Sequence, residues 1–181
     1  MYQSQLETKD LILGKMKIED AQKMMENFWS QSETAKYMLW SLTTTYKDAV
    51  ERAQRTINFQ KDHMAYTVYE KSSGEPIGMA GMIEVEPNVW EDAGLGVGPQ
   101  FTGRGYGKQI LMALVDECFR IGATKVICSC FQENLPSKYM QLKCGFEYTH
   151  SEPKTRQRDG YNYIADFHVI TKEKYQQLNK K

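Results

Sequence analysis

Residues 98–107 read Gly-Pro-Gln-Phe-Thr-Gly-Arg-Gly-Tyr-Gly, and this stretch decides how the rest of the chain is interpreted. It lies between a predicted strand, Val89–Val97, and an amphipathic helix predicted from about Gly105 to Ile121. Glycines at 103, 105 and 107 remove the β-carbons that would hold a ligand away from the backbone. The first N–H groups of a helix lack intrahelical partners, and the helix dipole favours negative charge there. The stretch therefore predicts an anion-binding cradle at Gln100–Gly107.

Two familiar phosphate loops do not fit this spacing. A Walker loop would need Gly-Lys-Ser/Thr, and the dinucleotide fingerprint would need Gly-x-Gly-x-x-Gly inside an early strand–helix–strand unit. A glycine-rich turn that only caps the following helix is one alternative. A nucleotide binder whose loop imitates the cradle is another.

Hydrophobic periodicity predicts a strand, two helices, three strands, a helix, a strand, a helix and two strands. The first strand contains Leu6, Leu11 and Leu13, and the others are Ala65–Glu70, Pro76–Val85, Val89–Val97, Lys125–Cys130, Phe146–His150 and Tyr163–Thr171. The helices cover about Asp20–Trp29, Thr45–Asp62, Gly105–Ile121 and Pro136–Lys143. This order predicts an α/β (α+β) fold, in which a mixed central sheet of about seven strands has helices on both faces. No repeat or long linker divides the chain, so residues 1–181 are predicted to form a single domain.

The balance of acidic and basic residues limits the classes of partner that the chain is expected to bind. Lys and Arg together number 23, as do Asp and Glu, so the formal net charge is zero. Nucleic acid or an anionic membrane as the main partner would call for a basic face, so neither is predicted. No apolar stretch approaches the roughly 20 residues of a membrane span, and the polar start has no signal-peptide core, so a cytoplasmic location is expected. The four cysteines are predicted to be reduced core residues, and no metal site is predicted; they are Cys118, Cys128, Cys130 and Cys144.

Two blocks of sequence resemble a known family. The pattern Val97-x-Pro99-Gln100-x-x-Gly103-x-Gly105-Tyr106-Gly107 is similar to the CoA-binding loop of the GNAT N-acetyltransferases. Asn134-x-x-Ser137, followed by Lys143-Cys144-Gly145-Phe146, looks like a second signature of that family, in the expected order and separation. The segments Glu7–Leu13, Tyr37–Trp40 and Arg158–Tyr163 resemble its ribosomal-protein-alanine (RimJ/RimL-type) branch. The resemblance implies a GNAT fold splayed between strands 4 and 5, about Asp92–Val97 and Lys125–Cys130. It also implies acetyl-CoA as donor, with its pyrophosphate on the cradle Gln100–Gly107 and its pantetheine between these strands.

The resemblance also implies which residues contact acetyl-CoA. They are Leu95, Gly96, Val97, Gln100, Phe101, Thr102, Gly103, Arg104, Gly105, Tyr106, Gly107, Lys108, Asn134, Ser137 and Gln141.

Acetyl transfer to an amine needs proton removal and stabilisation of the oxyanion. The candidate bases are Glu84, Glu86 and Asp92, each of which could also be a solvated carboxylate at a strand end. Asp92 is preferred because it lies on the strand that should flank pantetheine, and strand alternation predicts that it shares a face with Gly94 and Gly96. A backbone N–H of Leu95–Val97 is the predicted oxyanion donor, and the glycines there predict a β-bulge.

Protonation of the leaving thiolate needs a second group. Many family members place a Tyr where Gln141 stands here. Tyr139 lies about 200° away around the helix axis, whereas Ser137 is one turn before Gln141 on the same face. Ser137 is therefore the candidate proton donor, although it could instead bond the backbone at the helix start.

We thus expect an enzyme that moves acetyl from acetyl-CoA to a primary amine, by direct attack in a ternary complex. The acceptor would be a protein N-terminus or a small amine, and the chain a monomer or homodimer. Trp29, Tyr37 and Trp40 could line the acceptor cleft or belong to the core. Because Gln141 replaces the usual Tyr, a catalytically weak CoA-binding module that acts as a sensor or regulator remains the alternative.

Overall fold

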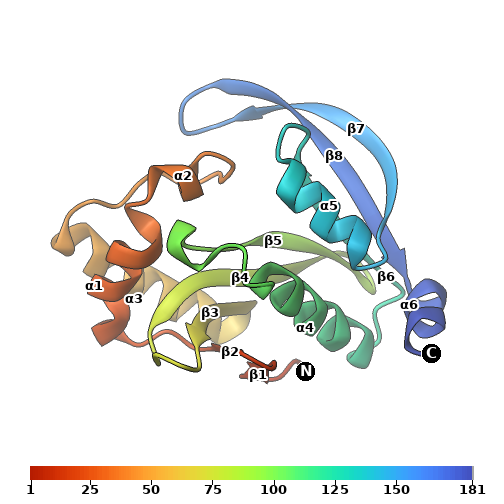
Figure 1. The fold of residues 1–181 in the computed structure, drawn as a ribbon, viewed down its shortest axis with the longest axis horizontal. Coiled ribbons are helices and arrows are strands. Elements are labelled where there is room, and N and C mark those ends of the chain that lie inside the picture. The colour runs from red at the N-terminus through yellow and green to blue at the C-terminus, as the bar shows by residue number, and fades with distance from the viewer. Residues whose placement is uncertain (181) are drawn as a thin grey trace.

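A computed structural model describes residues 1–180 and contains one mixed eight-stranded sheet (Figure 1). Its strand order is β1-β2-β3-β4-β5-β6-β8-β7. The strands are β1 (Leu6–Glu7), β2 (Leu11–Gly14), β3 (Met64–Glu70), β4 (Pro76–Glu86), β5 (Val89–Val97), β6 (Lys125–Phe131), β7 (Glu147–Arg156) and β8 (Tyr161–Thr171). The α-helices are α1 (Ala21–Met24), α2 (Ser32–Ala35), α3 (Tyr46–Asp62), α4 (Tyr106–Arg120), α5 (Leu135–Lys143) and α6 (Lys172–Asn179). Short 3₁₀ turns form η1 (Ile18–Asp20) and η3 (Pro99–Phe101), and η2 (Met25–Trp29) is a π-helix.

The first predicted strand is in fact two strands, which accounts for the eighth strand of the sheet. The Thr8 N–H donates to the Leu11 carbonyl at 3.0 Å, so the chain turns back and Leu6 pairs with Leu13. The turn Thr8-Lys9-Asp10 contains neither glycine nor proline, the two strongest turn signals, and Asp10 is its only residue of a type common in turns.

Other departures lie at helix and strand ends. The helix predicted over Asp20–Trp29 changes from 3₁₀ through α to π geometry, and the helices α2 and α6 were not predicted. The strand predicted to end at His150 continues to Arg156, through Pro153. Strand β7 lies at the edge of the sheet, where a proline without an N–H donor is tolerated.

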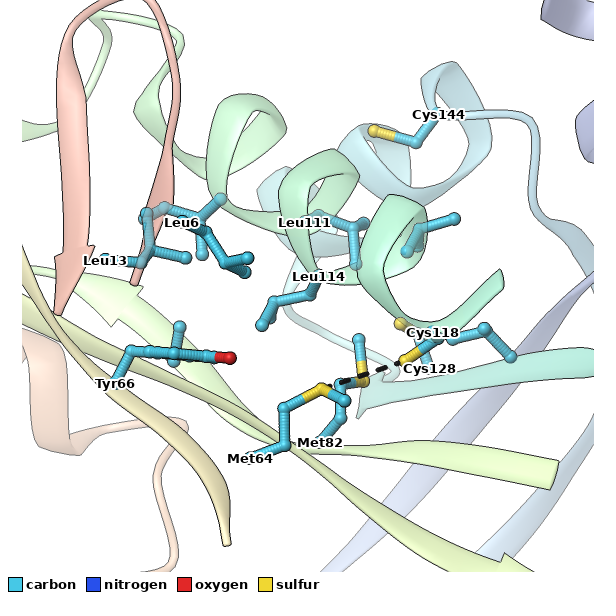
Figure 2. Close-up of a cluster of buried hydrophobic side chains, with 14 of the residues drawn as sticks. Leu6, Leu13, Met64, Tyr66, Met82, Leu111, Leu114, Cys118, Cys128 and Cys144 are labelled. Carbon is cyan, nitrogen blue, oxygen red and sulfur yellow. Dashed lines mark hydrogen bonds between the residues drawn. The ribbon is translucent and has the colours of Figure 1, made fainter. Parts of the chain in front are cut away.

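Helices cover both faces of the sheet, as predicted. The apolar stripe of α4 packs on one face, where Leu111, Leu114 and Cys118 approach Met64 and Met82 (Figure 2). Helices α5 and α6 lie on the same side as α4. On the other face, α3 and the α1–η2 segment enclose a second core around Met24, Phe28 and Trp29. No helix within residues 1–180 combines the length and apolarity needed to cross a bilayer.

The strands β5 and β6 pair over only part of their length. Their parallel ladder consists of Val89–Lys125, Trp90–Val126 and Glu91–Ile127, after which the strands separate. We call the region between β5 after Glu91 and β6 after Ile127 the split. It confirms the predicted splay, and its strands are numbered one higher because the N-terminal strand is double.

Candidate active site

The cradle, Gln100–Gly107, presents a run of free backbone donors where α4 begins. No N–H group of residues 103–108 has a hydrogen-bond partner among the residues that the structure describes. Gly103 and Gly105 have φ values of +77° and +78°, and a β-carbon on either would meet no atom within 4 Å. Gly107 has a different role, since a β-carbon there would lie 2.7 Å from the Met140 sulfur of α5. The open backbone and the helix N-terminus together fit a diphosphate.

Several side chains of the cradle turn toward the protein rather than outward. Arg104 Nη1 donates to Glu70 Oε1 at 2.8 Å, and the Tyr106 hydroxyl donates to the same oxygen at 2.7 Å. These contacts hold the pKa of Glu70 below its usual value, chiefly through the Tyr106 bond. Gln100 Nε2 donates to the Asn27 side-chain oxygen at 3.2 Å. Because Glu70 balances Arg104, the attraction for an anion comes mainly from the backbone, with the exposed Lys108 nearby.

Two further side chains of the cradle also contact neighbouring parts of the protein. Phe101 is buried in the α4-side core, and the exposed Thr102 donates its hydroxyl hydrogen to the Pro99 carbonyl at 2.7 Å. If these two residues contact a cofactor, as predicted, they would do so through their backbone atoms.

Asp92 lies at the apex of the split. Its Oδ1 accepts a hydrogen bond from the Ser129 N–H at 3.1 Å, one residue beyond the last β5–β6 pair on its own strand. The carboxylate thus replaces a missing ladder contact. Burial raises the pKa of Asp92 to about 7, although the Ser129 bond acts in the opposite direction. A carboxyl group with this pKa can accept a proton near neutral pH.

The predicted bulge is confirmed, and it changes which residues share a face with Asp92. Ala80 lies opposite Leu95 and Met82 opposite Asp92, so β5 contains one extra residue between these pairs. Gly94 has a φ of +100° there. Directly opposed residues share a face, so Asp92 lies with Leu95. Gly96 lies on the opposite face of β5, toward Met38. The expectation that Asp92 and Gly96 share a face is therefore wrong.

The bulged segment also contains backbone donors for an oxyanion. Leu95, Gly96 and Val97 pair with β4 on one side. Beyond Glu91, no ladder pair with β6 is present within residues 1–180. N–H groups alternate between the two sides of a strand, so those of this segment that point away from β4 point into the split.

The other carboxylate candidates lie toward the β4–β5 turn. Glu84 is exposed, and its Oε1 accepts a hydrogen bond from the Asn88 N–H of that turn at 2.8 Å. Its strand partner is Trp90, two residues before Asp92. Glu86 is exposed at the end of β4. The structure therefore places only Asp92 at the apex of the split.

Helix α5 presents Ser137 and Gln141 on its inner side. Asn134 caps the helix, since its Oδ1 accepts from the Ser137 N–H at 3.4 Å. Gln141 Nε2 donates to Ser137 Oγ at 3.2 Å. Gln141 is only 3% exposed, whereas Tyr139 is 56% exposed, in agreement with the helix geometry predicted. Gln141 Oε1 is buried without a partner among residues 1–180, so this helix face holds an acceptor that a ligand N–H could satisfy.

A bridging segment, residues 35–40, links the two strands that separate at the split. Met38 packs on Gly96 of β5, and the Tyr37 ring lies 5.6 Å from the Phe131 ring at the end of β6. Two arginines of the β7–β8 hairpin hold the backbone of this segment, and the tip of the hairpin lies above α2 in Figure 1.

The arginine contacts are short and involve only main-chain carbonyls. Arg156 Nη1 donates to the Lys36 carbonyl at 2.7 Å. Arg158 donates to the carbonyls of Trp40 and Ala35 at 2.6 and 2.9 Å. Sequence reasoning missed this role because the two partners are more than 100 residues apart. The carboxylate nearest to the arginines in sequence, Asp159, pairs with them inside the hairpin itself.

A pocket of about 700 Å³ opens on the α3 side of the sheet. Its floor is lined by small residues that include Ala65, Gly81 and Ala93, and Trp29 and Trp40 contribute to its walls. Ala93 is the neighbour of Asp92, so the pocket reaches the bulge of β5 from the face opposite to α4. Trp29 and Trp40 both line this pocket, and Trp29 is at the same time a buried core residue. The Tyr37 ring lies tilted against Phe131, outside the pocket lining.

Comparison with known proteins gives one family over most of the chain. A family described as "Acetyltransferase (GNAT) domain" matches residues 10–147. The chain is 27% identical over 110 residues to a glucosamine 6-phosphate N-acetyltransferase of Arabidopsis thaliana, covering 57% of this chain and 71% of the relative.

Two solved structures have the same fold. The ribosomal-protein-S5-alanine acetyltransferase from Vibrio fischeri superposes with a TM-score of 0.76 at 14% identity, covering 96% of this chain and 99% of that one. The microcin C7 self-immunity acetyltransferase MccE, solved with acetyl-CoA and AMP, gives a TM-score of 0.78 at 16% identity over 91% and 93% of the two chains.

Proposed function

This chain belongs to the GNAT acetyltransferase family, and we propose that it transfers an acetyl group to a primary amine by direct attack in a ternary complex. It is an acyltransferase whose donor is acetyl-CoA. The observation that carries the proposal is the run of unpartnered N–H groups at residues 103–108, beside a split with a near-neutral carboxyl group at its apex.

The residues that would hold the donor come from both sides of the split. The backbone of the cradle binds the diphosphate, and the glycines allow this approach. Asn134, Ser137 and Gln141 face pantetheine from α5, where the unpaired Gln141 oxygen can accept from an amide N–H. When bound, acetyl-CoA supplies the activated thioester.

Asp92 is the proposed general base. An amine must lose a proton to complete its attack, and a carboxylate with a pKa of about 7 takes up that proton efficiently near neutral pH. Glu84 is not proposed, because its carboxylate serves the β4–β5 turn. The N–H groups of Leu95–Val97 that face the split stabilise the oxyanion.

Ser137 is the proposed proton donor to the leaving thiolate. Its hydroxyl accepts from Gln141 Nε2 and lies against the Cys130 thiol, so its own hydrogen would turn to the leaving thiolate when acetyl-CoA is bound. The Gln141–Ser137 pair would take the place of the Tyr that many family members have.

The acceptor would be a protein N-terminus or a small amine that enters from the α3-side pocket, next to Ala93. The names of two relatives, a glucosamine 6-phosphate acetyltransferase and a ribosomal-protein acetyltransferase, support an amine of either kind. The second candidate function, a weakly catalytic CoA-binding regulator, is favoured only by Gln141 at the usual Tyr position.

Amine-dependent thiol release tests the proposal directly. The purified chain would be incubated with acetyl-CoA and a panel of primary amines, and free CoA would be measured with a thiol reagent. We expect release that depends on at least one amine and yields the N-acetylated product by mass spectrometry. Tight acetyl-CoA binding with no turnover of peptides or small amines would favour the regulator instead.

A further inference from the structure

The α3-side pocket contains two arginines without a carboxylate partner. Arg52 and Arg55 both line it, from positions three residues apart on α3. Neither forms an ion pair with Asp or Glu in the part of the chain from residue 1 to residue 180. Like charges at this helical spacing repel each other, and a bound anion would relieve that repulsion.

Arg52 is held rigidly in the wall of the pocket. Its guanidinium lies 4.8 Å from the Trp29 ring and 4.4 Å from the Trp40 ring. Its Nη1 donates to the Ser41 carbonyl and to Thr43 Oγ1, at 3.2 and 2.9 Å. Both bonds use the same nitrogen, so Nε and Nη2 keep donors for another acceptor. A preorganised guanidinium edge of this kind matches the two oxygens of a carboxylate or phosphate.

The electrostatic surroundings of Arg52 agree with this geometry. Burial lowers the pKa of Arg52 to about 10, and the charge of Arg55 acts in the same direction. Two carboxylates, Asp48 and Glu51, also line the pocket. The Asp48 carboxylate accepts the Thr45 hydroxyl at 2.6 Å at the start of α3, and Glu51 is exposed. Neither carboxylate lies within ion-pair distance of the two arginines in residues 1–180, so no direct contact occupies the free donors of Arg52.

We propose that the amine acceptor carries an anionic group, a carboxylate or a phosphate, which binds Arg52 and Arg55 while the amine lies beside Ala93 at the bulge of β5. This inference rests on the proposed function. It deepens that function because it names the class of acceptor: an amine with a second, anionic anchor at the opposite wall of the pocket.

Matched pairs of acceptors test the anion directly. Amino acids and dipeptides would be compared with their C-terminal amides, and phosphoethanolamine with ethanolamine, so that carboxylate and phosphate are distinguished. We expect kcat/KM to be about tenfold or more higher for the anionic member of at least one pair, the effect of one charge-assisted bidentate contact.

Variants of α3 separate the arginine site from general charge. Arg55 makes no side-chain hydrogen bond within the described residues, so Arg55→Gln and Arg55→Glu should fold normally. We expect Arg55→Gln to reduce the anionic preference to about threefold or less and Arg55→Glu to abolish it, with neutral acceptors unchanged. Lys47→Gln is the control, because Lys47 is an exposed cation of the same helix outside the pocket lining, and it should keep the preference.

The outcomes for the two proposals differ. Turnover of neutral amines without an anionic preference, or a preference that survives Arg55→Glu, overturns the anionic acceptor and leaves the acetyltransferase intact. If no amine is turned over, the proposed function fails, and calorimetric titration of phosphoethanolamine and of a free dipeptide decides the anion site. Saturable binding that Arg55→Glu removes supports it, and no binding to the wild-type chain overturns it.

Discussion

The carboxyl group of Asp92 lies where β5 and β6 part, and this position determines both its hydrogen bond and its ionisation. Its Oδ1 accepts from the Ser129 N–H, and burial raises its pKa to about 7. An asparagine keeps an oxygen for the same N–H but cannot take up a proton, so this single substitution separates the chemical role of the residue from its structural role.

Asp92→Asn should lower kcat by about 100-fold or more, the usual contribution of a general base. The dissociation constant of acetyl-CoA should stay within about twofold, because the Ser129 contact is retained. The wild-type kcat/KM should rise with pH and level off above about 7, whereas the variant should show no such step. A wild-type-like rate or an unchanged pH profile would remove Asp92 from the base role.

The same substitution should change stability in a pH-dependent manner. The raised pKa means that the folded state holds this proton more tightly than the unfolded chain, whose Asp has a pKa near 3.8. The native state is therefore penalised increasingly as pH rises from about 4 to about 7, and fully above 7. Asp92→Asn should raise the free energy of unfolding relative to wild type, and it should do so more at pH 8 than at pH 5. The increase at pH 8 should be at most about 4 kcal/mol. Urea unfolding at both values measures this, and an equal effect at both would contradict the raised pKa.

Gly105 tests the cradle at a single backbone position. Gly105→Val places a β-branched side chain in the open space over the free N–H groups, at a φ of +78°. We expect acetyl-CoA affinity to fall at least about tenfold, with a stability loss of about 1–2 kcal/mol from the left-handed conformation. Gly160→Val is the matched control, since Gly160 has a φ of +70° and open space in the β7–β8 turn. Calorimetric titration should show normal affinity in the control, and equal losses in both variants would argue against the cradle.

At the scale of elements, the long β7–β8 hairpin holds a loop that is distant in sequence. Its arginines hold the carbonyls of the bridging segment, and that segment in turn contacts both β5 and β6. The hairpin therefore fixes the bridging segment across the split through main-chain contacts, independently of the cradle.

Arg158→Ala removes two hydrogen bonds to the bridging segment, at 2.6 and 2.9 Å. We expect the KM for the acceptor to rise about tenfold while acetyl-CoA affinity stays unchanged, because positioning is lost only on the acceptor side. The neighbouring Gln157→Ala serves as control, since Gln157 is exposed and should leave both constants unaltered. Equal losses of acceptor and acetyl-CoA binding would indicate a general structural defect instead.

For the whole molecule, bound acetyl-CoA should stabilise the folded state, because it would contact elements on both sides of the split. Acetyl-CoA at 100 times its dissociation constant should stabilise the folded chain by about 2.7 kcal/mol through mass action. Thermal denaturation should therefore show a clear rise in Tm with acetyl-CoA and none with ATP or NAD at equal concentration. A comparable rise with ATP or NAD would favour a general nucleotide site.

Much of the architecture could be predicted from local patterns. The stripe Ile110–Phe119 predicts α4, and all of its predicted core positions are buried. The predicted bounds of β5 match the structure, and Gly103 and Gly105 of the cradle have positive φ values that favour glycine. The missed turn at Thr8–Asp10 and the long β7 through Pro153 lacked these local signals.

The sequence alone therefore determined the order of elements from α3 to β8, the glycine turn before α4 and the family, because backbone conformation at glycines and amphipathic stripes depends on near neighbours in the chain. Only the tertiary structure decided that Asp92 shares a face with Leu95 and that burial raises the pKa of its carboxyl group. It also decided that Arg156 and Arg158 bind the bridging segment and that Arg52 has no carboxylate partner within residues 1–180. Each of these depends on burial or on contacts between residues remote in sequence, and such contacts exist only after the strands have paired and the helices have packed.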